Sequence, residues 1–223
     1  MSNFSEFVHR YGPHMLKASG ETMAMVSISM AIGLVSGLFF GCALFMTRTG
    51  GIKENKVIHI VLNLYVNIVR SIPFLLFVIF LVPVTRSIVG TGFGTRASAF
   101  PLALIAVALY ARLAEQTLLE VNPDVIESAH AMGAKPHHIL RHVVLVEALP
   151  GLVLSFTSVF ISLISYSTVM GLVGGGGIGD FAIIYGYQRN NMGIVAFAVV
   201  IMVGIVLIVQ TAGNRLANYF DKR

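Results

Sequence analysis

Histidine and glutamate pairs are the first residues of this sequence that could do chemistry. Glu127 and His130 form a Glu-x-x-His pair, the spacing that di-iron helical bundles use. His138 and His142 lie four residues apart, so both could reach one metal ion, but no third ligand is evident. The patterns His-Glu-x-x-His and Gly-x-Ser-x-Gly do not occur. A metal-dependent enzyme is therefore only an alternative, and we expect no metal site.

Nucleotide chemistry needs a loop that cradles phosphates, and no such loop is evident. The P-loop pattern Gly-x-x-x-x-Gly-Lys-Ser/Thr is absent, so any energy from ATP has to come from a partner. Gly174, Gly176 and Gly179 satisfy Gly-x-Gly-x-x-Gly, but no strand precedes them and Val199 stands about where the acid is expected. We therefore interpret the glycines as a flexible turn between two membrane spans.

A stripe of hydroxyl groups could serve transport. Four serines recur at spacings of three, four and three, and a tyrosine and a methionine follow them: Ser155, Ser158, Ser162, Ser165, Tyr166 and Met170. Such a face offers hydrogen bonds to a zwitterion and apolar contacts to a thioether. Serines in apolar helices also hold neighbouring helices together. A translocation path and helix packing both stay open as interpretations of this stripe.

The elements that carry these residues are membrane spans. The chain is 56% hydrophobic and 11% charged, with a mean hydropathy of +0.84, whereas soluble domains are about 25% charged. Thr22–Met46 is free of charged residues for 25 positions, enough for a hydrocarbon core that needs about 20. The sequence predicts an all-α polytopic membrane protein whose five spans cover residues 20–46, 57–83, 97–113, 150–173 and 192–214.

Two of these spans have distinctive features. The third span is charge-free only over Ala97–Ala111, so Arg96 and Arg112 are expected to snorkel to the membrane interfaces. The first span carries small residues at strict four-residue spacing, namely Ser29, Gly33, Gly37 and Gly41. This spacing places them on one helix face and predicts close packing against another helix.

Basic residues predict the orientation of the spans. With the N-terminus outside, nine of the 15 Lys and Arg fall in inside segments and five in outside segments. The polar segment 112–149 and the C-terminus are then cytoplasmic. Because the basic residues are scattered between apolar spans, nucleic acid is not expected as a partner, and the lipid bilayer is.

The polar segment predicts a docking helix. Asn122 is a candidate N-cap, Pro123 suits the first helical position, and Gly133 suits a left-handed C-terminal cap. Pro136 is placed to begin a second helix. Small residues and one methionine share a face of the first helix at spacings of three and four, at Ser128, Ala131 and Met132. A helix tethered to spans at both ends can place this face against another protein.

The same segment resembles the EAA loop of bacterial ABC importer permeases. Glu127, Ala129 and Gly133 match the family pattern, Ser128 replaces its second position, and Val146 stands at the family's proline position. The resemblance implies a cytoplasmic coupling helix, within a coupling segment at about 122–147, that engages an ATPase. The coupling residues that it implies are Glu127, Ser128, Ala129, Ala131, Met132 and Gly133.

Further stretches extend the resemblance over most of the chain. RSIPFLLFVIFLVPVTRSIVGT, ESAHAMGAKP, EALPGLV and VGGGGIGDFAIIYGYQ are similar to the permease subunits of methionine ABC importers. The resemblance implies that residues 1–223 form a single transmembrane domain of the type I importer fold, in the bacterial inner membrane. It implies a homodimer, two cytoplasmic ATPase subunits that bind ATP and Mg²⁺, and an extracytoplasmic methionine-binding protein. No cofactor is expected in this chain, which is not itself an enzyme.

The resemblance implies import of methionine, as the L and D forms, by alternating access. A permease for another amino acid or small solute of the same class is the nearest alternative. An intramembrane metal-dependent enzyme is the more distant one.

Overall fold

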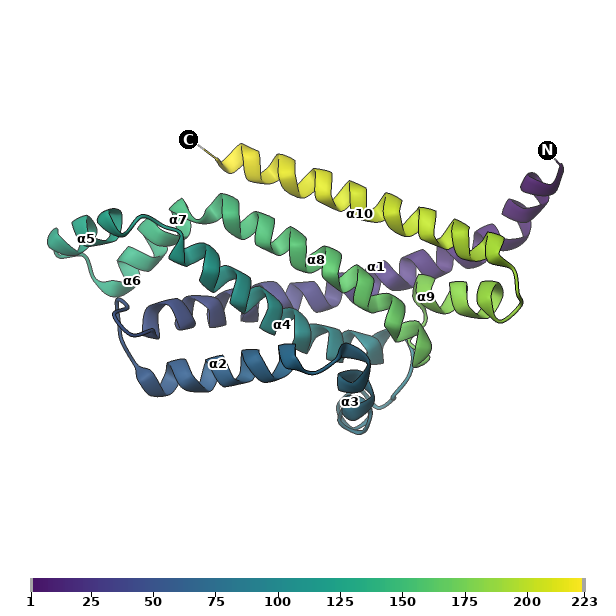
Figure 1. Cartoon of the computed structure of the whole chain (residues 1–223), viewed down its shortest axis with the longest axis horizontal. Helices are drawn as coiled ribbons and strands as arrows, with labels where there is room; N and C mark the ends of the chain where they lie inside the picture. Colours follow the sequence, from purple (N-terminus) through teal and green to yellow (C-terminus); the bar gives the residue numbers. More distant parts are fainter. Residues whose placement is uncertain (1, 222–223) are drawn as a thin grey trace. The chain divides into compact units, whose positions relative to one another are not determined.

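The computed structural model describes residues 2–221, with side chains from His9 onward, and this part of the chain is helical without any strand (Figure 1). The α-helices are α1 (Ser2–Thr47), α2 (Lys56–Ser71), α3 (Phe74–Val89), α4 (Thr95–Leu119), α5 (Pro123–Ala131), α6 (Pro136–Ile139), α7 (Leu145–Glu147), α8 (Leu149–Leu172), α9 (Gly177–Phe181) and α10 (Met192–Phe220). Two π-helical turns, η1 (Leu140–Val144) and η2 (Ala182–Tyr187), continue α6 and α9. The predicted all-α class is confirmed.

The second predicted span, 57–83, is not one continuous helix. Helix α2 ends at Ser71, Pro73 is the N-cap of α3, and the chain bends at this break. Proline has no N–H to donate and disfavours helical geometry in the residue before it, so the helix ends there. Within the described residues, four helices are long and apolar enough to cross a membrane, or five if α2 and α3 together make one broken span.

The third predicted span is longer than expected. Helix α4 covers Thr95–Leu119 and therefore extends past both Arg96 and Arg112. Arg112 does not lie at a helix end from which it could reach the interface, because α4 continues for seven residues after it. It is instead half-buried and paired with Glu115, at 2.7 Å. A charge that is paired within the protein does not need to snorkel.

The chain divides into two compact units, each with its own packing. Unit 1 consists of Met1–Met30, Ile72–Ala103 and Phe160–Ile208. Unit 2 consists of Ala31–Ser71, Leu104–Val159 and Val209–Arg223. The single transmembrane domain expected for residues 1–223 stays a prediction.

In unit 2, the small-residue face of α1 packs directly against α4. A Cβ atom added to Gly41 would lie 2.8 Å from Ala114 Cβ, and one added to Gly33 would lie 2.7 Å from Ala106 Cβ. Gly37 approaches the Cβ of Tyr110 and the carbonyl oxygen of Val107 in the same way. Glycine is required here because any side chain would separate the two helices. The packing predicted for this stripe is confirmed.

In unit 1, the short helix α9 is held by α1. The Gly177 N–H donates to Glu21 Oε2 at 3.0 Å, and the Ile178 N–H donates to the Thr22 hydroxyl at 2.9 Å. These are among the first N–H groups of α9, which have no partner inside their own helix. Apolar residues beside the caps bury the contact, namely Met15, Ala18, Ile178, Phe181, Ile194 and Ala198. The glycine-rich turn is thus a structured element.

Candidate functional site

The predicted docking helix forms and is capped by its own sequence. The Asn122 side chain accepts a hydrogen bond from the Asp124 N–H at 2.9 Å, and Pro123 occupies the first turn. At the other end Gly133 has a φ of 78°. The Gly133 N–H donates to His130 O and the Ala134 N–H to Ala129 O, the pair of bonds that closes a Schellman motif. Both predicted caps of α5 are confirmed.

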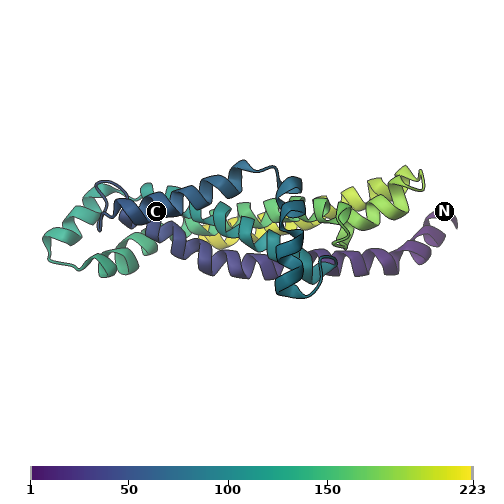
Figure 2. The ribbon, with the colours of Figure 1, turned by 90° about the horizontal axis from the view of Figure 1, so that it is seen from below.

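Helix α6 begins at Pro136, as predicted, and η1 and α7 carry the chain on to α8. The turn between α5 and α6 projects from the end of unit 2 in both views (Figure 1, Figure 2). The covalent links to α4 and α8 therefore hold the coupling segment at its two ends, and its tip is free to meet another molecule.

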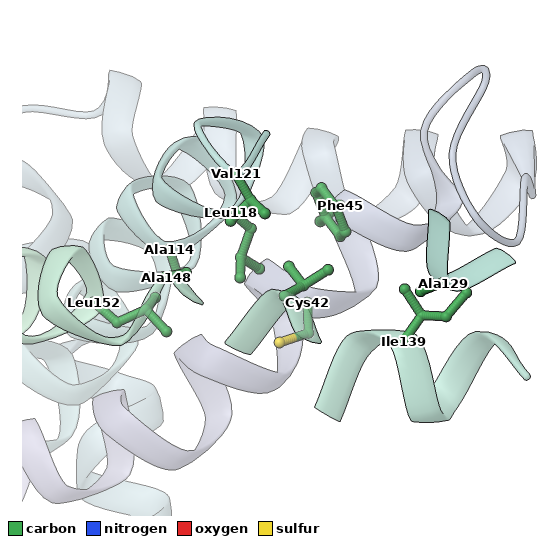
Figure 3. Packing of buried hydrophobic residues seen from close by; sticks show 10 residues of the cluster. Cys42, Phe45, Ala114, Leu118, Val121, Ala129, Ile139, Ala148 and Leu152 are labelled. Atoms are coloured by element: carbon green, nitrogen blue, oxygen red, sulfur yellow. The ribbon is translucent and has the colours of Figure 1, made fainter. Parts of the chain in front are cut away.

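A buried cluster fastens the coupling segment to α1, α4 and α8. Its members are Cys42, Phe45, Ala114, Leu118, Val121, Ala129, Ile139, Val144, Ala148 and Leu152. Ala129 of α5 and Ile139 of α6 face each other inside this cluster (Figure 3). Ala129 is only 5% exposed, so it cannot contact an ATPase directly as the sequence suggested. Ala129 is instead the small residue of the EAA pattern that lets α5 pack closely against the cluster.

The opposite face of α5 is open. Glu127, Ser128 and Ala131 are exposed, as is Gly133, and the Met132 side chain is 80% exposed. The Ser128 hydroxyl donates to Asp124 O at 2.7 Å, so its hydrogen bond is satisfied within the helix. The face thus presents small residues around one long, flexible thioether, a side chain that adapts readily to a binding surface.

Charged and titratable groups border this face. A recess of about 230 Å³ beside α5 is lined by Gly50, Gly51, Ile52, Ile126, Glu127, His130 and Ile139. On α6 and η1, the His138 ring centroid lies 4.1 Å from that of His137 and 5.8 Å from that of His142. Partial desolvation, followed by the charges of His138, Lys135 and His142, lowers the pKa of His137. The neutral imidazole is therefore favoured.

The histidines do not make a metal centre with their neighbours. Across the described side chains, no group of three or more His, Cys, Asp or Glu comes together in a way that could hold a metal ion. The pair His138 and His142 thus has no third protein ligand within this part of the chain.

The hydroxyl stripe on α8 divides into two groups. The Ser155 hydroxyl lies 2.9 Å from that of Thr117 on α4, and Met170 is buried with its carbonyl accepting from the Gly175 N–H. Ser158 and Ser165 are exposed, and their hydroxyls donate to carbonyls one turn earlier. Ser155 and Met170 therefore make contacts inside the chain, whereas the Ser158 and Ser165 side chains are exposed.

The remaining stripe residues are half-buried. Ser162 takes part in a contact within the chain, and the Tyr166 ring centroid lies 4.6 Å from that of Phe74. Tyr166 thus connects α8 to the beginning of α3, directly after the break at Pro73.

Sequence motifs do not predict two sets of polar contacts that the structure shows. Arg112, Glu115, Asn63 and Asn67 form a network in unit 2. Glu21 and Thr22 cap α9 in unit 1. The three-residue spacing of Arg112 and Glu115 is a usable signal for an ion pair on one helix. No local pattern indicates the other contacts, because their partners lie more than 40 residues apart.

Comparison with known proteins identifies the family of this chain. Residues 33–223 match the family of binding-protein-dependent transport system inner membrane components. The chain is 43% identical over 209 residues to the "Probable D-methionine transport system permease protein MetI" of Vibrio cholerae, covering 94% of this chain and 93% of the relative. It is 40% identical over 180 residues to the methionine import system permease protein MetP of Bacillus subtilis, covering 81% of each.

A solved structure agrees with these relatives. The inward-facing MetNI methionine ABC transporter contains a chain that superimposes with a TM-score of 0.90 at 40% identity. The match covers 93% of this chain and 96% of that chain. It therefore includes most of both units and of the segments between the spans.

Proposed function

We propose that this chain, which belongs to the family of binding-protein-dependent transport system inner membrane components, is the permease subunit of an ATP-driven methionine importer. The observation that carries the proposal is the agreement in fold with the MetNI permease chain over 93% of the sequence. The described spans and the family together make the chain a multi-pass protein of the inner membrane.

Methionine is the proposed substrate, as both the L and the D form. The relatives from Vibrio cholerae and Bacillus subtilis are both named for methionine, and the solved relative is a methionine transporter. Uptake of radiolabelled methionine into proteoliposomes containing the complete transporter and its binding protein tests this assignment. Uptake of another amino acid without uptake of methionine would show that the family alternative is correct.

The proposed assembly contains a second copy of this chain, two cytoplasmic ATPases that bind ATP and Mg²⁺, and an extracytoplasmic methionine-binding protein. The absence of a P-loop in the sequence supports the assignment of ATP to a separate subunit. The open face of α5 supports the docking of that subunit at the end of unit 2.

We propose that Glu127, Ser128, Ala131, Met132 and Gly133 form the contact with the ATPase. Gly133 acts through its left-handed backbone, which ends α5 and sets where Met132 points. When ATP closes the two ATPases, a tethered helix of this kind is displaced with them, and the permease alternates between outward and inward access.

Ala131→Trp tests this docking surface. An indole in place of an exposed methyl group would keep the ATPase from approaching α5, so copurification of the ATPase and methionine uptake should both fall. Val146→Trp is a size-matched control, since Val146 is 63% exposed but lies on α7 outside the proposed face. Normal uptake by the Ala131→Trp variant would contradict the assignment.

The proposed orientation places the N-terminus outside and the coupling segment and C-terminus in the cytoplasm, on the distribution of basic residues. Single cysteines introduced by Ala134→Cys and Ser87→Cys, in a Cys42→Ala background, distinguish the two sides. In intact cells an impermeant maleimide should modify the second variant and spare the first. The reverse result would invert the topology.

We propose that the translocation path runs along the accessible part of the α8 stripe, which consists of Ser158, Ser162, Ser165 and Tyr166. Exposed hydroxyls beside an aromatic ring suit a zwitterion with an apolar side chain. Ser158→Leu with Ser165→Leu should leave the assembly and its ATP hydrolysis intact while uptake is lost. Loss of the dimer in this variant would instead support packing as the role of the stripe.

A further inference from the structure

A half-buried charge, that of Arg112, sits at the centre of a hydrogen-bond network in unit 2. Arg112 Nη1 donates to Glu115 Oε2 at 2.7 Å, and the two side chains are 18% and 7% exposed. Arg112 Nη2 donates to Asn63 Oδ1 at 2.5 Å and to Asn67 Oδ1 at 2.9 Å. The planar guanidinium thus uses its fork to join α4 to two successive turns of α2.

The network continues to α1 with a defined direction. Because Asn63 Oδ1 accepts from Arg112, its Nδ2 faces His59 Nε2, at 3.0 Å, and donates to it. His59 is then the neutral tautomer protonated at Nδ1, which donates to Leu44 O at 3.3 Å. Three helices are therefore connected through one set of side chains.

The network lies next to the coupling segment. Arg112 and Glu115 are on the last two turns of α4, and the chain enters α5 three residues after α4 ends. Ala114 and Leu118, on these same turns, belong to the buried cluster that contains Ala129 of α5. The end of α4 is therefore packed against the coupling segment and hydrogen-bonded to α2.

Helix α2 leads directly to the break between Ser71 and Phe74. Helix α2 also packs through apolar residues, because Val66 is buried in a cluster with Leu44 of α1 and Ala111 of α4, and the Tyr65 hydroxyl donates to Leu104 O at 3.1 Å. The ion pair lies within α4 and holds the Arg112 guanidinium in place, and the hydrogen bonds from Arg112 to Asn63 and Asn67 require one relative position of α2 and α4. The network therefore fixes α2 to α4 in a single register.

We infer that Arg112 is a positioning residue for transport, whose fork makes α2 move with the coupling segment as one body. A displacement of the coupling segment then reaches the break after Ser71. The inference rests on the proposed function, because it presumes an ATPase that moves α5. It does not depend on which solute is carried.

The test measures whether ATP changes the exposure of the break. In the complete transporter, with Cys42→Ala, the cysteine introduced by Ser71→Cys is labelled with a maleimide, without nucleotide and with ATP plus vanadate. We expect the labelling rate to differ by about fivefold or more between these states, the lower range of typical coupling between distant sites. In the Arg112→Met/Glu115→Leu variant the difference should disappear, while the ATPase still binds and hydrolyses ATP.

Removing both charges together leaves neither partner buried and unpaired, so the double variant should assemble. A second variant, Asn63→Leu/Asn67→Leu, keeps the ion pair of Arg112 and Glu115 and removes the α2 acceptors, together with the Asn63 donor to His59. It should lose the same labelling difference. Gln116→Leu is the control, because Gln116 is exposed on the same turns of α4.

Arg112→Lys should give an intermediate labelling difference, since an ammonium can keep the ion pair but cannot reach both asparagines in the same plane. The reference protein carries only Cys42→Ala and Ser71→Cys. The inference is overturned if the labelling difference persists in both network variants, or if the labelling rate of the reference protein is the same with and without ATP. Methionine uptake by the reference protein is measured separately, so failure of the substrate assignment leaves this test unaffected.

Discussion

Two short helices between membrane spans, α5 in unit 2 and α9 in unit 1, are stabilised in opposite ways. Helix α5 is capped by residues next to it in sequence, Asn122 at its start and Gly133 after its end. Helix α9 receives its caps from Glu21 and Thr22, which lie 156 residues before the groups that they accept from. A helix with local caps keeps its shape while its surroundings move, whereas α9 exists only where α1 is in place.

This difference suits the two positions. The coupling segment has to transmit a displacement, which needs a helix that is rigid by itself. Helix α9 follows a turn in which Gly174, Gly176 and Gly177 all have positive φ. The caps of α9 therefore form only where α1 packs beside it in unit 1.

The largest difference is expected between alanine substitutions at two glycines with similar backbones. Gly177 and Gly133 have φ values of 87° and 78°, so alanine should cost about 1–2 kcal/mol at each. Only at Gly177 does the new Cβ meet neighbours, with Thr22 Oγ1 at 2.6 Å and Met25 Cε at 3.1 Å. Overpacking should add about 1–3 kcal/mol there. Thermal unfolding of the purified complex measures both.

Around Gly133 nothing lies within 4 Å of the added Cβ, so Gly133→Ala serves as the matched control for backbone strain alone. Equal shifts in the unfolding midpoint for the two variants would show that α9 is not held against α1 as described.

A smaller difference is expected between the caps themselves. Thr22→Val leaves the Ile178 N–H without an acceptor in a site where Thr22 is fully buried, which should cost about 1–3 kcal/mol. Asn122→Ala removes an exposed cap and should cost about 1 kcal/mol. Thr22→Ser keeps the hydroxyl and should recover most of the loss. A larger effect at Asn122 than at Thr22 would reverse the comparison.

The smallest effect is the dependence of helix stability on pH, and its sign differs between α9 and α6. Burial, and then the charge of Glu21, raises the pKa of Asp180 in α9 above its ordinary value of 3.8. The folded state then holds this proton more tightly than the unfolded state, so α9 loses stability as the pH rises through the interval above 3.8. Asp180→Asn should remove this dependence.

His137 in α6 responds in the other direction. Its pKa lies below the ordinary value of 6.5, so the folded state binds the proton less tightly, and α6 loses stability as the pH falls from 6.5. Hydrogen exchange, corrected for the intrinsic effect of pH, follows the amides of α6 and α9 separately. Protection that changes with the same sign in both helices would contradict the assignment.

The sequence by itself determined the features whose causes are local. Charge-free apolar runs predict helices long enough to cross a membrane, and Asn122, Pro123 and Gly133 predict the ends of α5. The four-residue spacing of Gly33, Gly37 and Gly41 predicts a close helix contact, although it does not say that the partner is α4. Pro73 is evident in the sequence, but whether a proline kinks a continuous helix or ends it depends on the residues that pack around it.

Only the tertiary structure decided the features that need partners far apart in sequence. The pairing of Arg112 with Asn63, the capping of Ile178 by Thr22 and the burial of Ala129 each depend on which helices lie side by side. A periodic apolar pattern defines a buried face without defining its neighbour, since many partners bury the same apolar area. A hydrogen bond to a buried charge or N–H has to meet one donor and one acceptor in one geometry, and that geometry exists only once the helices have packed.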